Sequence, residues 1–163
     1  INVSSIGGRI TFPFGGAYHA SKYAVEAMSD ALRRELGVFG VDVVLVEPGA
    51  IHTEFATRTV EKVQPYVELD SPYRALAEQA DSIASRVDAM AAKPIVVSRA
   101  IERAIRARRP RARYVAPFSG KILIGLLGRW LPTRLVDAML RFALRRQLGE
   151  GATTAQLSSG TTG

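Results

Sequence analysis

Apolar and polar positions are arranged along the first 50 residues in ways that predict strand, helix and strand in turn. Residues 1–5 (INVSS) alternate apolar and polar side chains, which is typical of a strand. Between residues 17 and 36, apolar side chains recur at steps of three and four, which predicts an amphipathic helix. Residues 41–49 (VDVVLVEPG) are apolar for most of their length, as in a strand that is buried on both faces.

The remainder of the chain predicts further helices and one more strand. Residues 50–92 are mostly polar and alanine-rich and predict helix in separate pieces, with 71–87 as the strongest candidate. Residues 93–110 predict another helix, and 112–117 a short strand. An amphipathic helix is expected after Pro132.

This order of elements predicts an α/β fold. Strands that alternate with helices are parallel, and the helices cover both faces of the sheet. Ligands of such sheets bind beyond the carboxyl ends of the strands. Ser4-Ser5 and Pro48-Gly49 each follow a predicted strand, so we expect both pairs at this same edge.

A tyrosine and a lysine four residues apart, Tyr18 and Lys22, lie near the start of the predicted helix and share one of its faces. A free phenol has a pKa of about 10, but a nearby ammonium group and a helix N-terminus both favour phenolate and make a tyrosine usable as a general acid/base. A serine hydroxyl at the adjacent strand end can hold a substrate oxygen where charge develops. The set fits proton transfer between a carbonyl and an alcohol, with hydride supplied by a cofactor. Taken alone, the pair also fits a half-buried tyrosine beside a solvated lysine.

Three linked motifs strengthen the catalytic interpretation: NVSS at residues 2–5, YHASK at 18–22 and VEPGAIHT at 46–53. In order and spacing they resemble the short-chain dehydrogenase/reductase family, and the resemblance extends from residue 1 to about residue 117. It implies the C-terminal part of a doubly wound, parallel-sheet Rossmann fold and an oxidoreductase that uses NAD or NADP. It also implies a homo-oligomer and a small-molecule carbonyl or alcohol substrate.

Residue by residue, the resemblance implies a catalytic set of Ser5, Tyr18 and Lys22, with Ser4 as a structural neighbour. Tyr18 would exchange the proton, and Lys22 would assist it and hold the nicotinamide ribose. His19 occupies a variable position of the motif and is given no catalytic role. The cofactor contacts that the resemblance implies are Tyr18, Lys22, Pro48, Gly49, Ile51 and Thr53, with His52 as a further candidate.

The family's glycine-rich phosphate loop, its Asn-Ala-Gly turn and its catalytic asparagine precede the serine strand and have no counterpart in these residues. We therefore expect residues 1–149 to be a partial catalytic domain of a longer enzyme, with 118–149 as an amphipathic extension and 150–163 as a disordered tail. On its own, such a chain exposes apolar surface, and we expect it to be poorly soluble or partly folded, and inactive. The choice between NAD and NADP would rest on the upstream residues.

Aromatic side chains flank the expected pocket. Phe12, Phe14 and Phe55 favour an apolar substrate of the steroid, retinoid, fatty or aromatic type, with residues 54–92 closing over it. The alternative is that these aromatic side chains only pack the surrounding loops against the body of the protein.

Composition excludes several classes of site. The chain has no cysteine, which rules out disulfides and thiolate chemistry, and with only two histidines no metal site is predicted. Residues 1–92 hold 8 basic and 12 acidic residues, whereas residues 93–163 hold 14 and 3. The basic part either solvates helix faces or meets an anionic partner, and its lack of interleaved aromatic residues disfavours nucleic acid.

No stretch approaches the roughly 20 apolar residues of a membrane span, and we expect a cytoplasmic or membrane-peripheral protein. The basic amphipathic stretch 120–148 fits peripheral contact with an anionic membrane, a dimer helix or a flap over the pocket. The alternative to an enzyme is a non-catalytic, Rossmann-like binding or regulatory protein whose basic half contacts membrane or nucleic acid.

Overall fold

The chain divides into two compact units, one made of Ile1–His52 and Ala91–Leu131 and the other of Thr53–Met90 and Pro132–Gly163. The residues described by this computed structural model are 1–12, 15–63, 65–68, 74–78, 80–119, 131–143 and 145–146.

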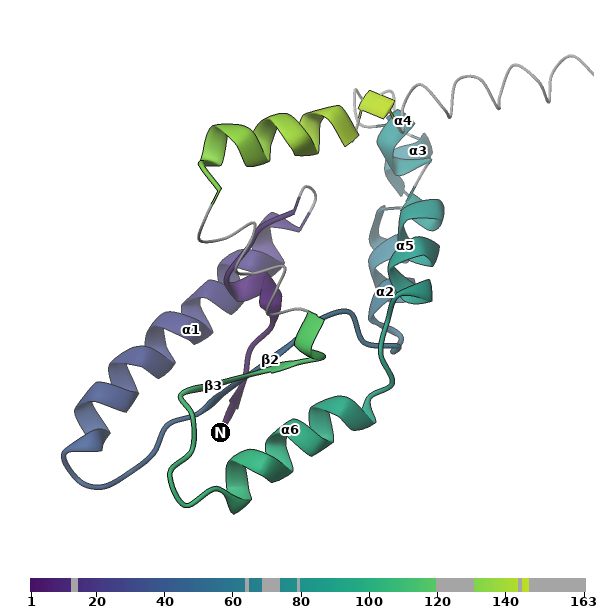
Figure 1. Ribbon diagram of the computed structural model, residues 1–163. Helices are drawn as coiled ribbons and strands as arrows, with labels where there is room; N and C mark the ends of the chain where they lie inside the picture. Colours follow the sequence, from purple (N-terminus) through teal and green to yellow (C-terminus); the bar gives the residue numbers. More distant parts are fainter. Residues whose placement is uncertain are drawn as a thin grey trace, which may run out of the picture. The chain divides into compact units, whose positions relative to one another are not determined.

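The first unit is built on a three-stranded parallel sheet in the order β1-β2-β3 (Figure 1). The strands are β1 (Asn2–Val3), β2 (Leu45–Pro48) and β3 (Arg113–Ala116). Helix α1 (Gly16–Gly37) connects β1 to β2, and helix α6 (Ile95–Arg106) precedes β3. This confirms the α/β fold with a parallel sheet that the sequence predicts.

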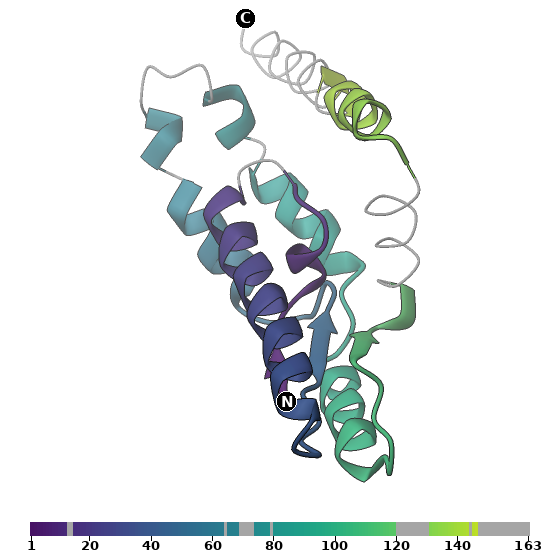
Figure 2. The same ribbon diagram turned by 90° about the vertical axis from the view of Figure 1, so that its left-hand side faces the viewer.

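The two faces of the sheet are packed differently. Val46 of β2 lies on the α6 side, in an apolar core with Ala100 and Ala116. One residue earlier and later along β2, the side chains point to the opposite face because a strand alternates. On that face Glu47 lies beside Arg113, which also forms ion pairs with α1. The helices therefore cover opposite faces of the sheet, as Figure 2 shows.

Helix α1 contacts the first unit through polar side chains. His19, Glu26 and Ser29 are its buried residues, and the Ser29 Oγ atom accepts a hydrogen bond of 2.9 Å from Asn2 Nδ2 of β1. Apolar positions whose spacing predicts the helix lie on its exposed side, among them Tyr23 and Met28. The spacing of apolar residues therefore predicts the helix correctly. It does not predict which face of the helix packs on the sheet.

The predicted boundaries agree closely with the structure in the first unit. The second strand is shorter than the predicted 41–49, because only Leu45–Pro48 pairs with β3, and of these residues only Leu45 and Val46 also pair with β1. The segment that follows β2 forms one isolated parallel β-bridge, between Ile51 and Ala92.

The second unit is helical. It contains α2 (Phe55–Val63), α3 (Pro65–Glu68), α4 (Arg74–Ala77) and α5 (Ala80–Ala89), and α2 packs against α5 (Figure 1). Helix in separate pieces is what the sequence predicts for this segment, although no single helix spans 71–87.

A further helix covers residues 133–143, as expected after Pro132. The predicted tail at 150–163 and the apolar run at 121–130 lie outside the described residues. In the part of the chain that the structure describes, no helix has both the length and the apolar character needed to cross a bilayer.

Candidate active site

Ser5 joins the carboxyl ends of β1 and β2. It lies two residues after the end of β1 and caps a short 3-10 helix, η1 (Ile6–Gly8), because its Oγ atom accepts a 3.0 Å hydrogen bond from the Gly7 N–H. The same hydroxyl donates a 3.3 Å hydrogen bond to the carbonyl oxygen of Pro48. The serine and the Pro-Gly turn therefore meet at one edge of the sheet, as predicted.

Tyr18 and Lys22 reach the same edge from the first turns of α1. The Lys22 Nζ atom lies 5.9 Å from the centroid of the Tyr18 ring and donates a 3.4 Å hydrogen bond to the carbonyl oxygen of Val3, at the end of β1. The Tyr18 ring packs against the turn formed by Ser5 and η1, which we call the serine turn. A Cβ atom added to Gly7 would lie 3.1 Å from the Tyr18 Cε1 atom. The structure thus brings together the three residues of the predicted catalytic set.

His19 holds the serine turn and the following loop against α1. It is buried, its Nδ1 atom lies 2.9 Å from the carbonyl oxygen of Gly7, and its Nε2 atom accepts a 3.1 Å hydrogen bond from the Phe12 N–H. Because a carbonyl only accepts, this pairing places the proton of a neutral imidazole on Nδ1. Sequence reasoning missed this bridging role. The available signal was the seven-residue spacing from His19 to Glu26, which puts both on one helix face.

Replacing His19 by leucine is expected to lower the free energy of unfolding by about 2 kcal/mol, because it leaves the Gly7 carbonyl and the Phe12 N–H without this partner. His19→Asn keeps a short side-chain donor for the Gly7 carbonyl and should recover about half of that loss. Urea unfolding of both variants measures the difference. Equal losses would show that the imidazole acts through packing alone.

Gly8 permits the close contact between η1 and α1. A Cβ atom there would lie 2.9 Å from the Lys22 carbonyl oxygen and from the Ser4 Oγ atom. Gly8→Ala is therefore expected to cost about 1–3 kcal/mol of stability and to displace the serine turn. Gly16→Ala is the matched control, because no atom lies within 4 Å of that Cβ position. Thermal unfolding should show a loss only for Gly8→Ala, and equal behaviour of the two variants would contradict this packing account.

The remaining predicted site residues are placed as follows. Gly49 lies at the sheet edge, where an added Cβ atom would meet Ile6 at 3.9 Å. Beyond it, Ile51 bridges to Ala92, and the His52 N–H donates a 2.9 Å hydrogen bond to the Ala92 carbonyl oxygen. These contacts fix the course of the loop after the Pro-Gly turn.

The described residues of the predicted aromatic set, Phe12 and Phe55, belong to different units. The Phe12 ring lies 6.0 Å from the His19 ring, in the first unit. Thr53 and Phe55 belong to the second unit, where the Phe55 N–H donates a 3.4 Å hydrogen bond to Thr53 Oγ1. Phe14 lies outside the described residues.

A partly buried group of charges lies behind the site, and we call it the ionic cluster: Arg9, Glu26, Asp30, Glu47 and Arg113. Arg113 is at its centre, with its Nε atom 3.0 Å from Glu47 and 3.1 Å from Glu26, and its Nη2 atom 2.6 Å from Asp30. Arg9, just after η1, lies 3.3 Å from Glu47. Because Glu47 directly precedes Pro48, the cluster connects α1 and β3 with the Pro-Gly turn.

Burial and ion pairing shift the pKa values of Glu47 and Asp30 in opposite directions. Burial, and then repulsion from Glu26, raises the pKa of Glu47 above its ordinary value despite the attraction of Arg9 and Arg113. Burial also acts to raise the pKa of Asp30, but the hydrogen bonds from Arg113 and Arg33 outweigh it and leave that pKa lowered. The one signal of this cluster in the sequence is Glu47, a charged residue within an apolar strand.

Known proteins with similar sequences indicate the family to which this site belongs. The sequence profile of the family described as short chain dehydrogenase matches residues 1–64. An NADPH-dependent 3-dehydrocapnine reductase from Ornithobacterium rhinotracheale is 36% identical over 147 residues, which cover 90% of this chain and 50% of that protein. The chain belongs to the short-chain dehydrogenase/reductase family.

Other members of the short-chain dehydrogenase/reductase family are similarly close. Retinol dehydrogenase 7 of Mus musculus is 39% identical over 149 residues, covering 86% of this chain and 46% of that one. The 17-beta-hydroxysteroid dehydrogenase type 6 of Rattus norvegicus is 32% identical over 155 residues, covering 90% and 48%. The chain therefore spans about half the length of the curated relatives it matches.

The fold is shared with a solved member of the same family. The crystal structure of a short-chain dehydrogenase from Streptomyces avermitilis superposes with a TM-score of 0.54 at 23% identity, covering 96% of this chain and 51% of that one. This likeness supports the Rossmann-type arrangement of the parallel sheet.

Proposed function

We propose that the protein is an NAD(P)-dependent oxidoreductase that transfers hydride between a nicotinamide and a carbonyl/alcohol pair. The observation that carries the proposal is the meeting of Ser5, Tyr18 and Lys22 at the carboxyl edge of the sheet. A hydroxyl, a phenol and an ammonium group form a set for proton transfer at a carbonyl oxygen, and none of them transfers hydride. The names of the relatives support the same class of reaction.

The residues present fit the nicotinamide end of such a cofactor. The Val3 carbonyl takes only one of the three N–H donors of Lys22, and ribose hydroxyls suit the others. Gly49 follows Pro48 at the same edge and has no side chain, which would let a planar ring approach its backbone. Lys22, Pro48 and Gly49 would hold this part of the cofactor, which supplies or accepts the hydride when bound.

The chain's own residues carry out the proton transfer in the proposed mechanism. In the reductive direction the Tyr18 hydroxyl donates its proton to the carbonyl oxygen, and in the oxidative direction the phenolate removes a proton from the alcohol. The Ser5 hydroxyl holds the same oxygen. Its present bond to the Pro48 carbonyl is 3.3 Å, which is long for an O–H donor, so the hydroxyl can turn to a substrate at small cost.

We further propose an apolar alcohol or ketone as the substrate. Relatives named as a retinol dehydrogenase and as a 17-beta-hydroxysteroid dehydrogenase support this class. Phe12 supports it from the chain itself, because it is a partly exposed aromatic residue in the loop that His19 ties to the catalytic helix.

Turnover of the full-length protein tests both proposals. Retinal, a 17-ketosteroid and a short polar ketone are each incubated with NADH or NADPH, and products are quantified by chromatography. We expect reduction of an apolar substrate with a kcat/KM that exceeds that for the polar ketone. A protein that oxidises neither cofactor would contradict the oxidoreductase, whereas preference for the polar ketone would contradict only the substrate class.

A further inference from the structure

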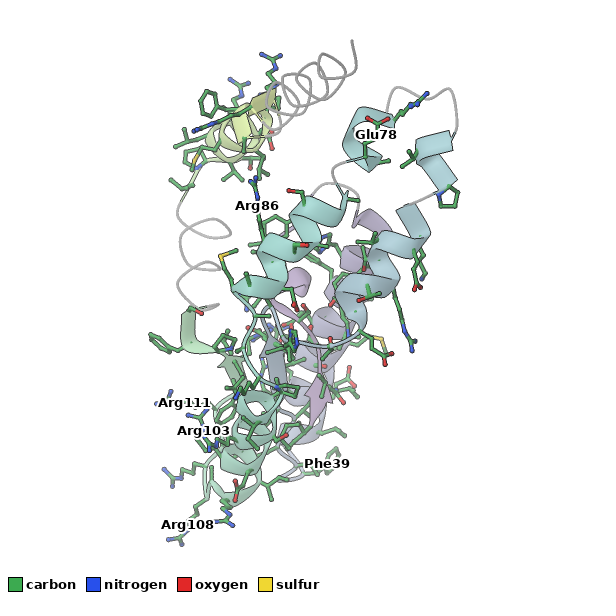
Figure 3. All side chains as sticks on the ribbon, turned by 90° about the vertical axis from the view of Figure 1, so that its right-hand side faces the viewer. Phe39, Glu78, Arg86, Arg103, Arg108 and Arg111 are labelled. Atoms are coloured by element: carbon green, nitrogen blue, oxygen red, sulfur yellow. The ribbon has the colours of Figure 1, made fainter. Side chains whose placement is uncertain are left out.

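A group of exposed arginines gathers at the end of the first unit opposite to the candidate active site. The group extends from the last turn of α6 into the segment before β3, and Figure 3 shows three of its members projecting from this end. Because this segment leads into β3, it lies at the amino ends of the parallel strands, whereas Ser5 lies at their carboxyl ends. We call this surface the arginine end, and it comprises Arg103, Arg106, Arg108, Arg109 and Arg111.

Most of this charge is not neutralised by the residues that the structure describes. Arg106 lies 2.8 Å from Glu102, one turn earlier in α6, and Arg103 donates to the carbonyl oxygen of Arg99. Within the described part of the chain, none of Arg103, Arg108, Arg109 and Arg111 has a carboxylate within 4 Å. Basic residues commonly stabilise the C-terminus of a helix. That explains Arg103 and Arg106, but not the three arginines beyond the end of α6.

Apolar side chains are exposed at the same end. Ile105, between two of the arginines, is 69% exposed. The turn that precedes β2 holds Val38 and Phe39, which are 79% and 77% exposed. Since β2 and β3 are parallel neighbours, the segments that lead into them lie at the same end of the sheet, and Figure 3 shows Phe39 at the end that carries the labelled Arg103, Arg108 and Arg111.

We propose that the arginine end, together with Ile105 and Phe39, docks the protein on an anionic lipid membrane. Guanidinium groups attract the phosphates and carboxylates of acidic headgroups, and an exposed isoleucine and phenylalanine enter the boundary between headgroups and acyl chains. Two features favour lipid over nucleic acid. Exposed apolar side chains accompany the arginines, with Ile105 between two of them and Phe39 at the same end, and one phenylalanine does not make the series of aromatic platforms on which bases stack. The inference does not depend on the proposed reaction.

Co-sedimentation with lipid vesicles tests the docking surface, using the full-length protein. Vesicles of phosphatidylcholine alone are compared with vesicles that contain phosphatidylserine at 30 mol per cent, about the anionic content that gives a cytoplasmic leaflet its negative potential. We expect binding to the anionic vesicles that is lost in about 0.5 M salt, where charges are screened beyond a few ångströms. Replacing Arg103, Arg108, Arg109 and Arg111 by glutamine should lower the partition coefficient by more than about 100-fold.

Two further variants separate charge from position and from apolar insertion. Changing Arg58, Lys62, Arg74 and Arg86 to glutamine removes the same net charge from the second unit and should leave binding within about threefold. Ile105→Ser with Phe39→Ser should weaken binding about tenfold or more at constant charge. Circular dichroism confirms that each variant is folded.

Three results would overturn the proposal. The first is equal binding to neutral vesicles, and the second is equal loss of binding in the variant of the second unit. The third is absence of vesicle binding combined with salt-dependent binding to a nucleic-acid duplex that the arginine variant abolishes, which would assign the surface to nucleic acid instead.

Discussion

Replacing Tyr18 by phenylalanine is expected to lower kcat by a factor of about 10² to 10⁴, the range that a positioned general acid/base contributes. The change removes only the hydroxyl. The ring keeps its contact with the serine turn at Gly7 and its edge-on contact with His19, at 5.6 Å between centroids. We therefore expect an unchanged free energy of unfolding and an NAD(P) dissociation constant within about threefold of that of the parent protein. The group that transfers the proton in the transition state is not needed to bind the cofactor in the ground state. Steady-state kinetics and cofactor titration measure the two effects separately.

The same helix provides a matched control. Tyr23 lies five residues further along α1 with 43% of its surface exposed, and Tyr23→Phe removes the same hydroxyl on an exposed side of the helix. Its kcat should be unchanged. If Tyr18→Phe retains full activity, Tyr18 is not the acid/base. If it loses cofactor affinity and stability together, the hydroxyl has a structural role and the non-catalytic alternative gains support.

The candidate site was predictable because its parts are set by local spacing. Two residues four apart on a helix must share a face, and the structure places the Lys22 ammonium 5.9 Å from the Tyr18 ring. Residues that follow parallel strands must lie at one edge, and Ser5 does meet Pro48 there. Neither result requires knowledge of what packs against these elements. The spacing of residues on a helix and at strand ends was therefore sufficient to predict that these side chains lie close together.

The packing of α1 was not predictable from its pattern. Its apolar residues indicate a helix, yet Met28 is 65% exposed while Glu26 and Ser29 are buried. The partner that makes burial of Glu26 tolerable is Arg113, which is 87 positions further along the chain. The spacing of apolar residues within one segment gives no information about a charged side chain that a distant strand contributes. For the same reason, the pattern predicts only that Glu47 belongs to an apolar strand, and not that it pairs with Arg113.

Protonation of Glu47 is expected to shape the pH dependence of stability. Its pKa is raised in the folded protein, so the folded state binds this proton more tightly than the unfolded state. The corresponding stabilisation is present below the ordinary pKa of a glutamate and is lost as the pH rises through the raised folded value. Glu47→Gln should remove this part of the profile and give a flatter curve of unfolding free energy above about pH 4.5, the unperturbed glutamate value. Urea unfolding at a series of pH values measures it, and an unchanged slope would show that folding does not raise the pKa of Glu47.

Removing the cation at the centre of the ionic cluster should have the largest effect on stability. Arg113→Gln leaves Glu26, Asp30 and Glu47 close to one another without their shared partner, and breaking a buried ion pair from one side costs about 3–5 kcal/mol. We expect the lower end, about 3 kcal/mol, because 26% of the Arg113 side chain is exposed. Glu26 adds to the cost, since its Oε1 atom is already buried without a hydrogen-bond partner among the described residues.

A double-mutant cycle shows whether the loss comes from uncompensated charge. In Arg113→Gln with Glu47→Gln, two neutral amides replace the pair at a separation of 3.0 Å, and one of the buried repulsions disappears. The double variant should therefore be more stable than Arg113→Gln alone, with a coupling of about 1–2 kcal/mol between the two sites. Arg33→Gln is the control, because it removes a cation that pairs with Asp30 from within the same helix and does not reach Glu47. Additive losses in the cycle would mean that Arg113 supports the sheet by packing its aliphatic stem. A positive coupling would mean that Arg113 and Glu47 stabilise the fold as an ion pair next to the Pro-Gly turn.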